Sequence, residues 1–187
     1  MAGEHASVAR AVRPASASTR RSPGSAGWMA CGLTLCVLVG VLCLEPFRVR
    51  GVSMLPELEN RQHILVDRLV FRWREVRRGD VVVLRMPGDP ARHLVKRVVG
   101  LPGECVAIRD GAVYVNGRRL AEPYLSGRVD RAETRPMIEV ARGHYYVLGD
   151  HRVLSSDSRA WGLIPARSIT GRAVLSYWPL GRAGRVH

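Results

Sequence analysis

A serine and a lysine 43 positions apart are the two residues of this 187-residue chain best suited to covalent chemistry. Lys96 is the one lysine among 29 Lys and Arg residues, and arginine stays protonated in protein sites. A serine hydroxyl is a weak nucleophile until a base accepts its proton, and a neutral lysine is one such base. A single lysine can also be the chance result of an arginine-rich composition. The setting of Lys96, and the Ser-Met-Leu-Pro segment 43 positions before it, favour chemistry, with Ser53 as nucleophile and Lys96 as general base.

Lys96 has to be neutral to act as a base. Its pKa must fall several units from the usual value of about 10.4, and burial has this effect. The apolar pairs Leu94-Val95 and Val98-Val99 flank it, and we expect them to remove water from the amine. Alternation along a strand places Leu94 and Lys96 on one face. His93 is the alternative base for Ser53, although a Ser-Lys pair requires no histidine.

A polar segment follows at 149–162, Gly-Asp-His-Arg-Val-Leu-Ser-Ser-Asp-Ser-Arg-Ala-Trp-Gly. Its serine, aspartate and arginine side chains could bond the lysine and support the site. The same composition is also typical of a surface loop whose turns are capped by side chains. The residues alone leave both interpretations open.

The elements that must position these residues are predicted to be strands. The apolar, β-branched runs that indicate strands are 63–70, 81–85, 145–148 and 173–178. Residues 105–115 predict a hairpin about Asp110-Gly111, and Asn116-Gly117 predicts another turn. Clear amphipathic helices are scarce and no repeat is found. We predict a mostly β fold, with one β-rich catalytic domain at 46–187.

Two segments of different character precede this domain. Residues 1–26 are rich in Ala, Ser, Arg, Gly and Pro without periodicity, which predicts a disordered basic tail. Residues 27–44 carry no charge, and such a length is near the lower limit for one helix crossing a core of about 30 Å. A cleavable secretory signal is the alternative, but the chain has no alanine between Ala30 and Ala91 for an Ala-x-Ala site. We predict an uncleaved transmembrane anchor.

Charge gives the expected orientation and partners. The arginines of the tail favour a cytoplasmic N-terminus and an extracytoplasmic domain in a single-pass plasma-membrane protein, although Arg48 and Arg50 weaken this argument. The net charge of +13 fits a surface close to anionic lipid. Acids are interleaved with the arginines and no five basic residues are consecutive, so we expect no nucleic-acid partner. The oligomeric state stays open.

Cysteine usage predicts neither a disulfide framework nor a metal centre. Three of the four cysteines lie inside the apolar stretch, which leaves Cys105 alone in the rest of the chain. No Cys/His spacing matches a zinc site. We expect no metal and no cofactor.

Four blocks in order resemble the type I signal peptidases, which are membrane-anchored serine proteases with a Ser-Lys dyad. The blocks are Gly51-Val-Ser-Met-Leu-Pro56, Gly79–Pro87, Val95–Glu104 and the polar segment 149–162. The resemblance extends from about residue 50 to residue 179. It implies a β-rich catalytic domain of the signal-peptidase type, with Ser53 as nucleophile and Lys96 as base.

The last block carries the residues expected to support the dyad. By this resemblance, Ser155 hydrogen-bonds the Lys96 amine and orients it. Asp157 and Arg159 form a supporting ion pair.

Three departures from the family pattern bear on the site. Glu57 stands where threonine is usual, and His151 stands where asparagine is more frequent. Gly51 replaces a serine that donates to the oxyanion in another branch of the family. The oxyanion hole is therefore expected to use backbone N–H groups, chiefly that of Ser53.

The implied substrate is a secretory preprotein, cut after its signal peptide where small residues occupy −1 and −3. We expect its cleavage site to bind extended against a sheet edge. The apolar residues near the dyad that are predicted to line the substrate pockets are Met54, Leu58, Leu94 and Val95. Each of them could equally belong to the core.

Other readings of the chain are a dedicated Ser-Lys processing peptidase for one pilin or conjugation substrate and a non-catalytic membrane module that binds preproteins or anionic lipid. A self-cleaving repressor is disfavoured, because no helix-turn-helix precedes Ser53 and an apolar segment does.

Overall fold

The computed structural model describes residues 25–125 and 129–187, and the chain divides into two compact units, 1–38 and 39–187. Helix α1 (Ser25–Leu42) overlaps the predicted anchor at 27–44. Among the described residues, no helix has both the length and the apolar character needed to cross a membrane. The predicted tail lies outside the described residues except for its last two positions.

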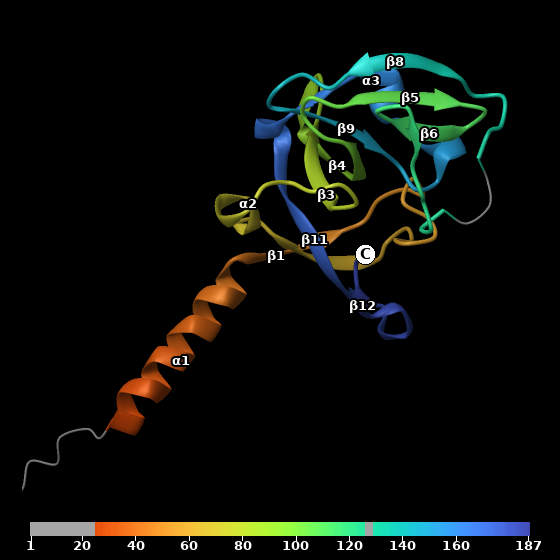
Figure 1. The fold of residues 1–187 in the computed structure, drawn as a ribbon. Helices are drawn as coiled ribbons and strands as arrows, with labels where there is room; N and C mark the ends of the chain where they lie inside the picture. The colour runs from red at the N-terminus through yellow and green to blue at the C-terminus, as the bar shows by residue number, and fades with distance from the viewer. Residues whose placement is uncertain (1–24, 126–128) are drawn as a thin grey trace, which may run out of the picture. The chain divides into compact units, whose positions relative to one another are not determined.

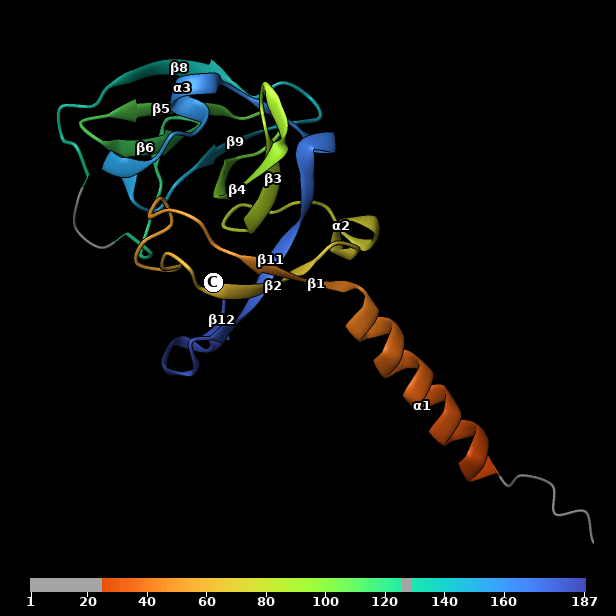
Figure 2. The same cartoon turned by 180° about the vertical axis from the view of Figure 1, so that it is seen from behind.

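In the described part of the second unit, eight strands form one antiparallel sheet (Figures 1 and 2). Its order is β1-β2-β11-β3-β4-β9-β10, and β12 pairs with β11. The strands are β1 (Leu44–Arg48), β2 (His63–Asp67), β3 (Val81–Met86), β4 (Asp89–Gly100), β9 (His144–Leu148), β10 (Ile164–Pro165), β11 (Ile169–Trp178) and β12 (Gly184–Arg185). The mostly β fold that the sequence predicts is therefore present.

A second sheet, four-stranded over the described residues, has the order β7-β6-β5-β8. Its strands are β5 (Cys105–Arg109), β6 (Ala112–Val115), β7 (Arg118–Arg119) and β8 (Arg135–Glu139). The predicted hairpin is confirmed: Asp110 and Gly111 join β5 to β6 with φ of 49° and 74°. Positive φ at both central residues is what a type I′ turn requires.

The remaining elements are short helices: α2 (Val70–Trp73), η1 (Arg152–Leu154), α3 (Ser158–Trp161), η2 (Ala166–Ser168) and η3 (Leu180–Arg182). The predicted strand 63–70 is too long, because β2 ends at Asp67. The Asp67 carboxylate accepts hydrogen bonds from the N–H groups of Leu69 and Val70, both at 2.9 Å. This local bonding turns the chain into α2.

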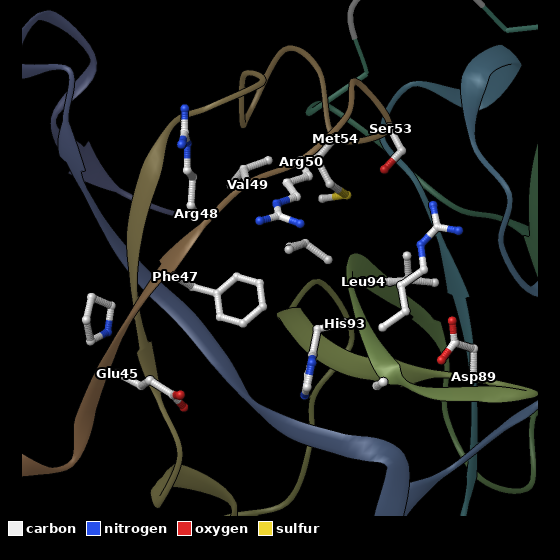
Figure 3. A pocket seen from close by; sticks show the side chains of 14 residues that line it. Glu45, Phe47, Arg48, Val49, Arg50, Ser53, Met54, Asp89, His93 and Leu94 are labelled. Atoms are coloured by element: carbon white, nitrogen blue, oxygen red, sulfur yellow. The ribbon is translucent and has the colours of Figure 1, made fainter.

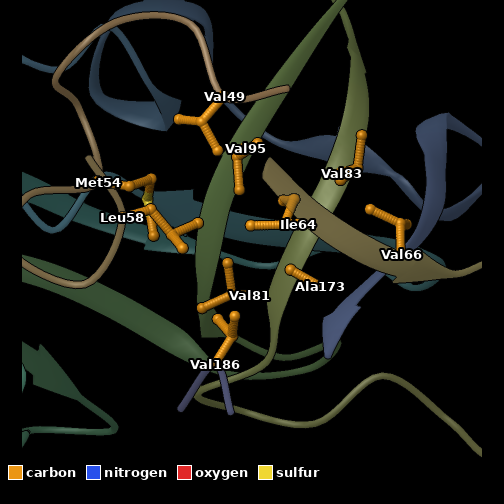
Figure 4. Packing of buried hydrophobic residues seen from close by; sticks show 10 residues of the cluster. All are labelled: Val49, Met54, Leu58, Ile64, Val66, Val81, Val83, Val95, Ala173 and Val186. Atoms are coloured by element: carbon orange, nitrogen blue, oxygen red, sulfur yellow. The ribbon is translucent and has the colours of Figure 1, made fainter. Parts of the chain in front are cut away.

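The core of the large sheet includes a cluster beneath the loop between β1 and β2 (Figure 4). Its members are Val49, Met54, Leu58, Ile64, Val66, Val81, Val83, Val95, Ala173 and Val186. The β-branched residues of β2 and β3 alternate into this cluster, as half-buried strands do. The cluster gives the loop that carries Ser53 an apolar base.

Candidate active site

Ser53 and Lys96 come from different parts of the large sheet. Ser53 lies on the loop 49–62 between β1 and β2, which we call the nucleophile loop, and Lys96 lies within β4. Strands β11 and β3 stand between β2 and β4 in the sheet. The Lys96 Nζ nevertheless lies 2.8 Å from the Ser53 Oγ. This is the separation over which a hydroxyl proton passes to a general base.

Lys96 is buried, with 2 % of its surface exposed. Burial lowers its pKa from 10.5 to about 8, because the charged ammonium loses its hydration. The neighbouring charges act in both directions, since Asp157 and Asp150 raise the pKa while Arg159 and Arg92 lower it. A substantial neutral fraction of the amine is therefore present at mildly alkaline pH.

Three of the four apolar neighbours expected to desolvate the amine are buried, and the fourth, Leu94, is half-buried. Val95 is 8 % exposed, and Val98 and Val99 are fully buried. Across the sheet, Lys96 pairs with Val82 of β3, which is also fully buried. The apolar residues around Lys96 therefore keep water from its amine, which is the effect that lowers its pKa.

The loop after β9 packs against the nucleophile loop at Gly149. A Cβ at this position would lie 2.2 Å from the Ser155 Oγ and 2.5 Å from the Ser53 carbonyl oxygen. No side chain fits such a space without displacement of the backbone. The next contact is a hydrogen bond of 3.0 Å from the His151 N–H to the same Ser53 oxygen. Residue 149 thus has to be glycine for the two loops to meet.

His151, at the position where asparagine is usual, caps the short helix η1. Its Nδ1 accepts a hydrogen bond of 3.2 Å from the Leu154 N–H. An asparagine side chain offers a similar acceptor. The departure is therefore compatible with the local bonding of this loop.

Asp157 and Arg159 form an ion pair with Nε–Oδ1 and Nη2–Oδ2 distances of 2.8 Å. The Asp157 carboxylate also accepts the Gly149 N–H at 3.0 Å. Burial raises the pKa of Asp157, but the Arg159 guanidinium and the Gly149 N–H outweigh it, and the pKa lies below its usual value. The charged pair therefore holds Gly149 in its place against Ser53.

Ser155 lies beside this contact but does not make the predicted bond. Its buried Oγ makes no bond to the Lys96 amine, which is bonded to Ser53 instead, and it lies close enough to the Asp157 carboxylate to help lower the pKa of that group. The hydroxyl lies so close to Gly149 that it excludes a side chain at that position. Its role toward Lys96 stays a prediction.

The Ser53 backbone N–H makes no hydrogen bond within the described part of the chain. The predicted role of this N–H toward the oxygen of a scissile carbonyl is compatible with this and stays a prediction. Gly51 has φ of 96° and donates its own N–H to the Asn60 Oδ1 at 3.0 Å. A glycine at 51 therefore shapes the nucleophile loop and offers no side-chain donor.

A groove of about 720 Å³ begins at Ser53 and runs between residues 45–50 and the start of β4. Met54, Leu94 and Val95, three of the four predicted pocket residues, line it. Figure 3 shows Phe47 pointing into the groove, with Glu45 and Asp89 at the end away from Ser53. The groove therefore combines apolar side chains with charged ones, and the arginines that line it include Arg50, which Figure 3 shows next to Met54.

Leu58 does not line this groove. Its side chain is fully buried and belongs to the apolar cluster below the nucleophile loop (Figure 4). The sequence shows an apolar residue near Ser53 but not the direction in which its side chain points. Its membership of that cluster accounts for its burial.

His93, the alternative base, also lines the groove. Its ring makes an edge-on contact with Phe47, with centroids 5.8 Å apart. Within the described residues, the Ser53 hydroxyl is bonded to Lys96 and not to His93. The geometry therefore favours the lysine. No cluster of three or more potential metal-binding side chains occurs in the part of the chain that is described.

Arg97 and Asp150 form a buried pair that the sequence analysis did not single out. Arg97 also donates to the Gly79 carbonyl oxygen at 3.0 Å, and its guanidinium carbon lies 4.1 Å from the centre of the Tyr124 ring. Both partners lie inside the blocks that carry the family resemblance, but their pairing joins residues 53 positions apart. In the sequence, the signal that could have pointed to Arg97 and Asp150 is that they directly follow Lys96 and Gly149.

Comparison with known proteins identifies the class. Residues 24–178 match the family described as signal peptidase, peptidase S26. Since this match covers most of the chain, the protein belongs to the signal peptidase family S26 and is a serine endopeptidase.

Individual relatives agree with this family. The chain is 36 % identical over 155 residues to signal peptidase I T of Bacillus subtilis, a match covering 78 % of this chain and 79 % of that protein. It is 34 % identical over 175 residues to a signal peptidase I of Leptolyngbya laminosa, covering 88 % and 85 % of the two chains. A crystal structure of a signal peptidase I from Enterococcus faecalis is 30 % identical, with a TM-score of 0.48, and covers 54 % of this chain and 98 % of that chain.

Proposed function

We propose that this protein removes N-terminal signal peptides from secretory preproteins, with Ser53 as nucleophile and Lys96 as general base. The observation that carries the proposal is the 2.8 Å contact between the Ser53 Oγ and the Lys96 Nζ, made by a buried amine. The signal peptidase relatives support the same reaction class.

In the acylation step, the neutral Lys96 Nζ accepts the Ser53 hydroxyl proton while the Oγ attacks the scissile carbonyl carbon. The carbonyl oxygen becomes an oxyanion, which the free Ser53 N–H stabilises. The Lys96 ammonium then gives its proton to the leaving amine as the C–N bond breaks. The mature protein departs, and the signal peptide stays bound to Ser53 as an ester.

Deacylation reverses these roles with water. Lys96 takes a proton from a water molecule that attacks the ester carbon, and the Ser53 oxygen leaves and is reprotonated. The buried Asp157–Arg159 pair contributes by fixing the loop that packs on Ser53. Neither step requires a metal or a cofactor.

The groove beside the dyad is proposed to bind the cleavage site in an extended conformation. Met54, Leu94 and Val95 supply apolar walls next to Ser53. Walls of this kind suit small side chains at −1 and −3, because a larger side chain would have to displace packed groups. Main-chain pairing with the flanking strands would tolerate the variable sequences of signal peptides.

A membrane location completes the proposal. We assign residues 27–44 as a single anchor with a cytoplasmic N-terminus, on the strength of an uncharged stretch that follows a basic tail. An extracytoplasmic domain 46–187 would then meet signal peptides where they leave the bilayer. The positive net charge favours anionic lipid beside it.

The test is cleavage of a preprotein with an Ala-x-Ala site by the full chain in detergent micelles. Lys96→Arg keeps the positive charge but cannot act as a base, so we expect a loss of at least about 10³-fold, as for other catalytic base removals. Ser53→Ala is the matched control for the nucleophile. Equal activity of the parent and Lys96→Arg would exclude the dyad.

The choice of preproteins separates the remaining functions. Cleavage of several unrelated preproteins supports a general signal peptidase, whereas cleavage of one pilin-like substrate indicates a dedicated processor. If the parent cleaves none and an acylating inhibitor does not label Ser53, the non-catalytic membrane module is favoured.

A further inference from the structure

The segment 184–187, which we call the C-terminal clip, lies beyond the family match at 24–178 and packs beneath the active site. Its first two residues form β12, which pairs with β11. The Val186 side chain is 5 % exposed and belongs to the same apolar cluster as Met54 and Leu58 (Figure 4). The clip therefore shares a core with the nucleophile loop.

The main chain of His187 bonds to both segments that carry the dyad. Its N–H donates to the Glu57 Oε1 at 2.6 Å, and Glu57 lies on the nucleophile loop four residues after Ser53. Its oxygen accepts a hydrogen bond from the Arg97 guanidinium, and Arg97 directly follows Lys96. One residue of the clip thus bridges the nucleophile loop and β4.

The Arg97 end of this bridge is rigid. Its guanidinium makes two hydrogen bonds to Asp150 and one to the Gly79 carbonyl oxygen, and the side chain is 2 % exposed. The Glu57 end belongs to a loop that has no direct strand pairing with β4, because β11 and β3 intervene. A bond from the rigid end to the loop therefore restricts how far Ser53 can move from Lys96.

We propose that the C-terminal clip positions the nucleophile loop against β4, with Glu57 as the positioning residue on the loop. The inference rests on the proposed function, since it concerns the distance between Ser53 and Lys96. It also gives a role to Glu57, which stands where the family usually has threonine. A carboxylate accepts a hydrogen bond from an N–H more strongly than a hydroxyl does, and its longer side chain reaches the His187 N–H.

The consequence for catalysis follows from the geometry of proton transfer. A displacement of about 1 Å at reacting atoms can cost on the order of 10²-fold in rate. Loss of the Glu57 contact is therefore expected to lower kcat by about 10- to 100-fold. The Michaelis constant should change less, because Glu57 does not line the groove.

The experiment compares three variants of the full chain in the preprotein cleavage assay. Glu57→Ala removes the acceptor, and Glu57→Gln keeps an oxygen that accepts the His187 N–H. Glu59→Ala is the matched control, because it removes an exposed ion pair between the same loop and Arg182 without touching the clip. We expect a low kcat for Glu57→Ala only, with the other two within about threefold of the parent.

A second readout is independent of turnover. Since Lys96 is the one lysine of the chain, selective ¹³C labelling of lysine gives a single side-chain signal whose pH titration reports this residue. A loosened nucleophile loop admits water to the amine. Glu57→Ala should then shift the titration midpoint upward from about 8, toward the value of 10.5 for a solvated lysine.

If the parent protein cleaves preproteins, the kcat values of the variants test whether the C-terminal clip positions the nucleophile loop. A kcat of Glu57→Ala within twofold of the parent, or an equal loss in Glu57→Gln, would overturn the inference.

If the parent cleaves no preprotein, the proposed function fails and the lysine titration decides instead. A midpoint that shifts in Glu57→Ala alone supports the clip, and an unchanged midpoint excludes it. If Glu57→Ala does not fold, Glu57→Asp, one methylene shorter, carries the same test.

Discussion

Arg97 and Asp150 form a buried, two-point ion pair, with an Nε–Oδ1 distance of 2.8 Å and an Nη2–Oδ2 distance of 2.6 Å. The two residues are 2 % and 4 % exposed. One directly follows the predicted base Lys96, and the other directly follows Gly149, which touches the Ser53 carbonyl oxygen. The pair therefore joins the strand of the base to the loop that packs on the nucleophile.

Replacing one partner of this pair should destabilise the fold strongly. Arg97→Met leaves the Asp150 carboxylate buried and uncompensated, so we expect a loss of about 3–5 kcal/mol in the free energy of unfolding, measured with urea. In the double variant Arg97→Met/Asp150→Leu the loss should be smaller. Arg68→Met breaks an exposed pair with Glu45 and is the control, with an expected change below about 1 kcal/mol.

Activity should rise with pH through about 8, where Lys96 loses its proton. Below that value, kcat/KM is expected to fall about tenfold for each pH unit, because only the neutral amine accepts the serine proton. The measurement is a pH profile of preprotein cleavage, compared with the titration of the single labelled lysine. A lysine midpoint near 10.5 would contradict the burial argument.

The same lowered pKa predicts how stability depends on pH. The folded state holds Lys96 with a pKa of about 8, against 10.5 when unfolded, so between these values the unfolded state binds more protons and stability rises with pH. Below about pH 8 the buried lysine costs up to roughly 3 kcal/mol, at 1.36 kcal/mol per pKa unit.

Lys96→Met should therefore be more stable than the parent at pH 7, by up to roughly 3 kcal/mol. This advantage should shrink above pH 8 and vanish above about 10.5. Urea unfolding of both proteins across this range tests the prediction. A constant difference between them at all pH values would show that Lys96 does not titrate differently on folding.

Gly149→Ala should impair catalysis, because its Cβ would lie 2.5 Å from the Ser53 carbonyl oxygen. The nucleophile loop has to move away, and we expect kcat to fall by about 10- to 100-fold. Gly181→Ala is the control, since a Cβ there meets nothing within 4 Å. Full activity of Gly149→Ala would show that close contact between the two loops is not needed for catalysis.

The candidate nucleophile and base were predicted from residue types together with the family resemblance. A single lysine within an apolar run, together with a serine in a matching block, leaves few other candidates for a base and a nucleophile. Strands β3, β9 and β11 were predictable in part, because runs of β-branched residues favour the strand conformation whatever their distant neighbours are. The β5–β6 hairpin was predictable because an Asp-Gly pair adopts positive φ.

Strands with weak local signals were not predictable. Strand β1 (Leu44–Arg48) and strand β8 (Arg135–Glu139) contain proline and charged residues, and they form because a neighbouring strand is available for pairing. The sequence likewise did not show where β2 ends, since the bonds from Asp67 compete with the strand pattern.

The sequence by itself determined which groups are available for catalysis, since residue type sets what each side chain can do chemically. Only the tertiary structure decided which of them meet. It brought Ser53 to 2.8 Å from Lys96, paired Arg97 with Asp150 and placed Leu58 in the core and not in the groove. These outcomes depend on contacts between distant segments, and such contacts arise from packing of the whole domain and not from local preference.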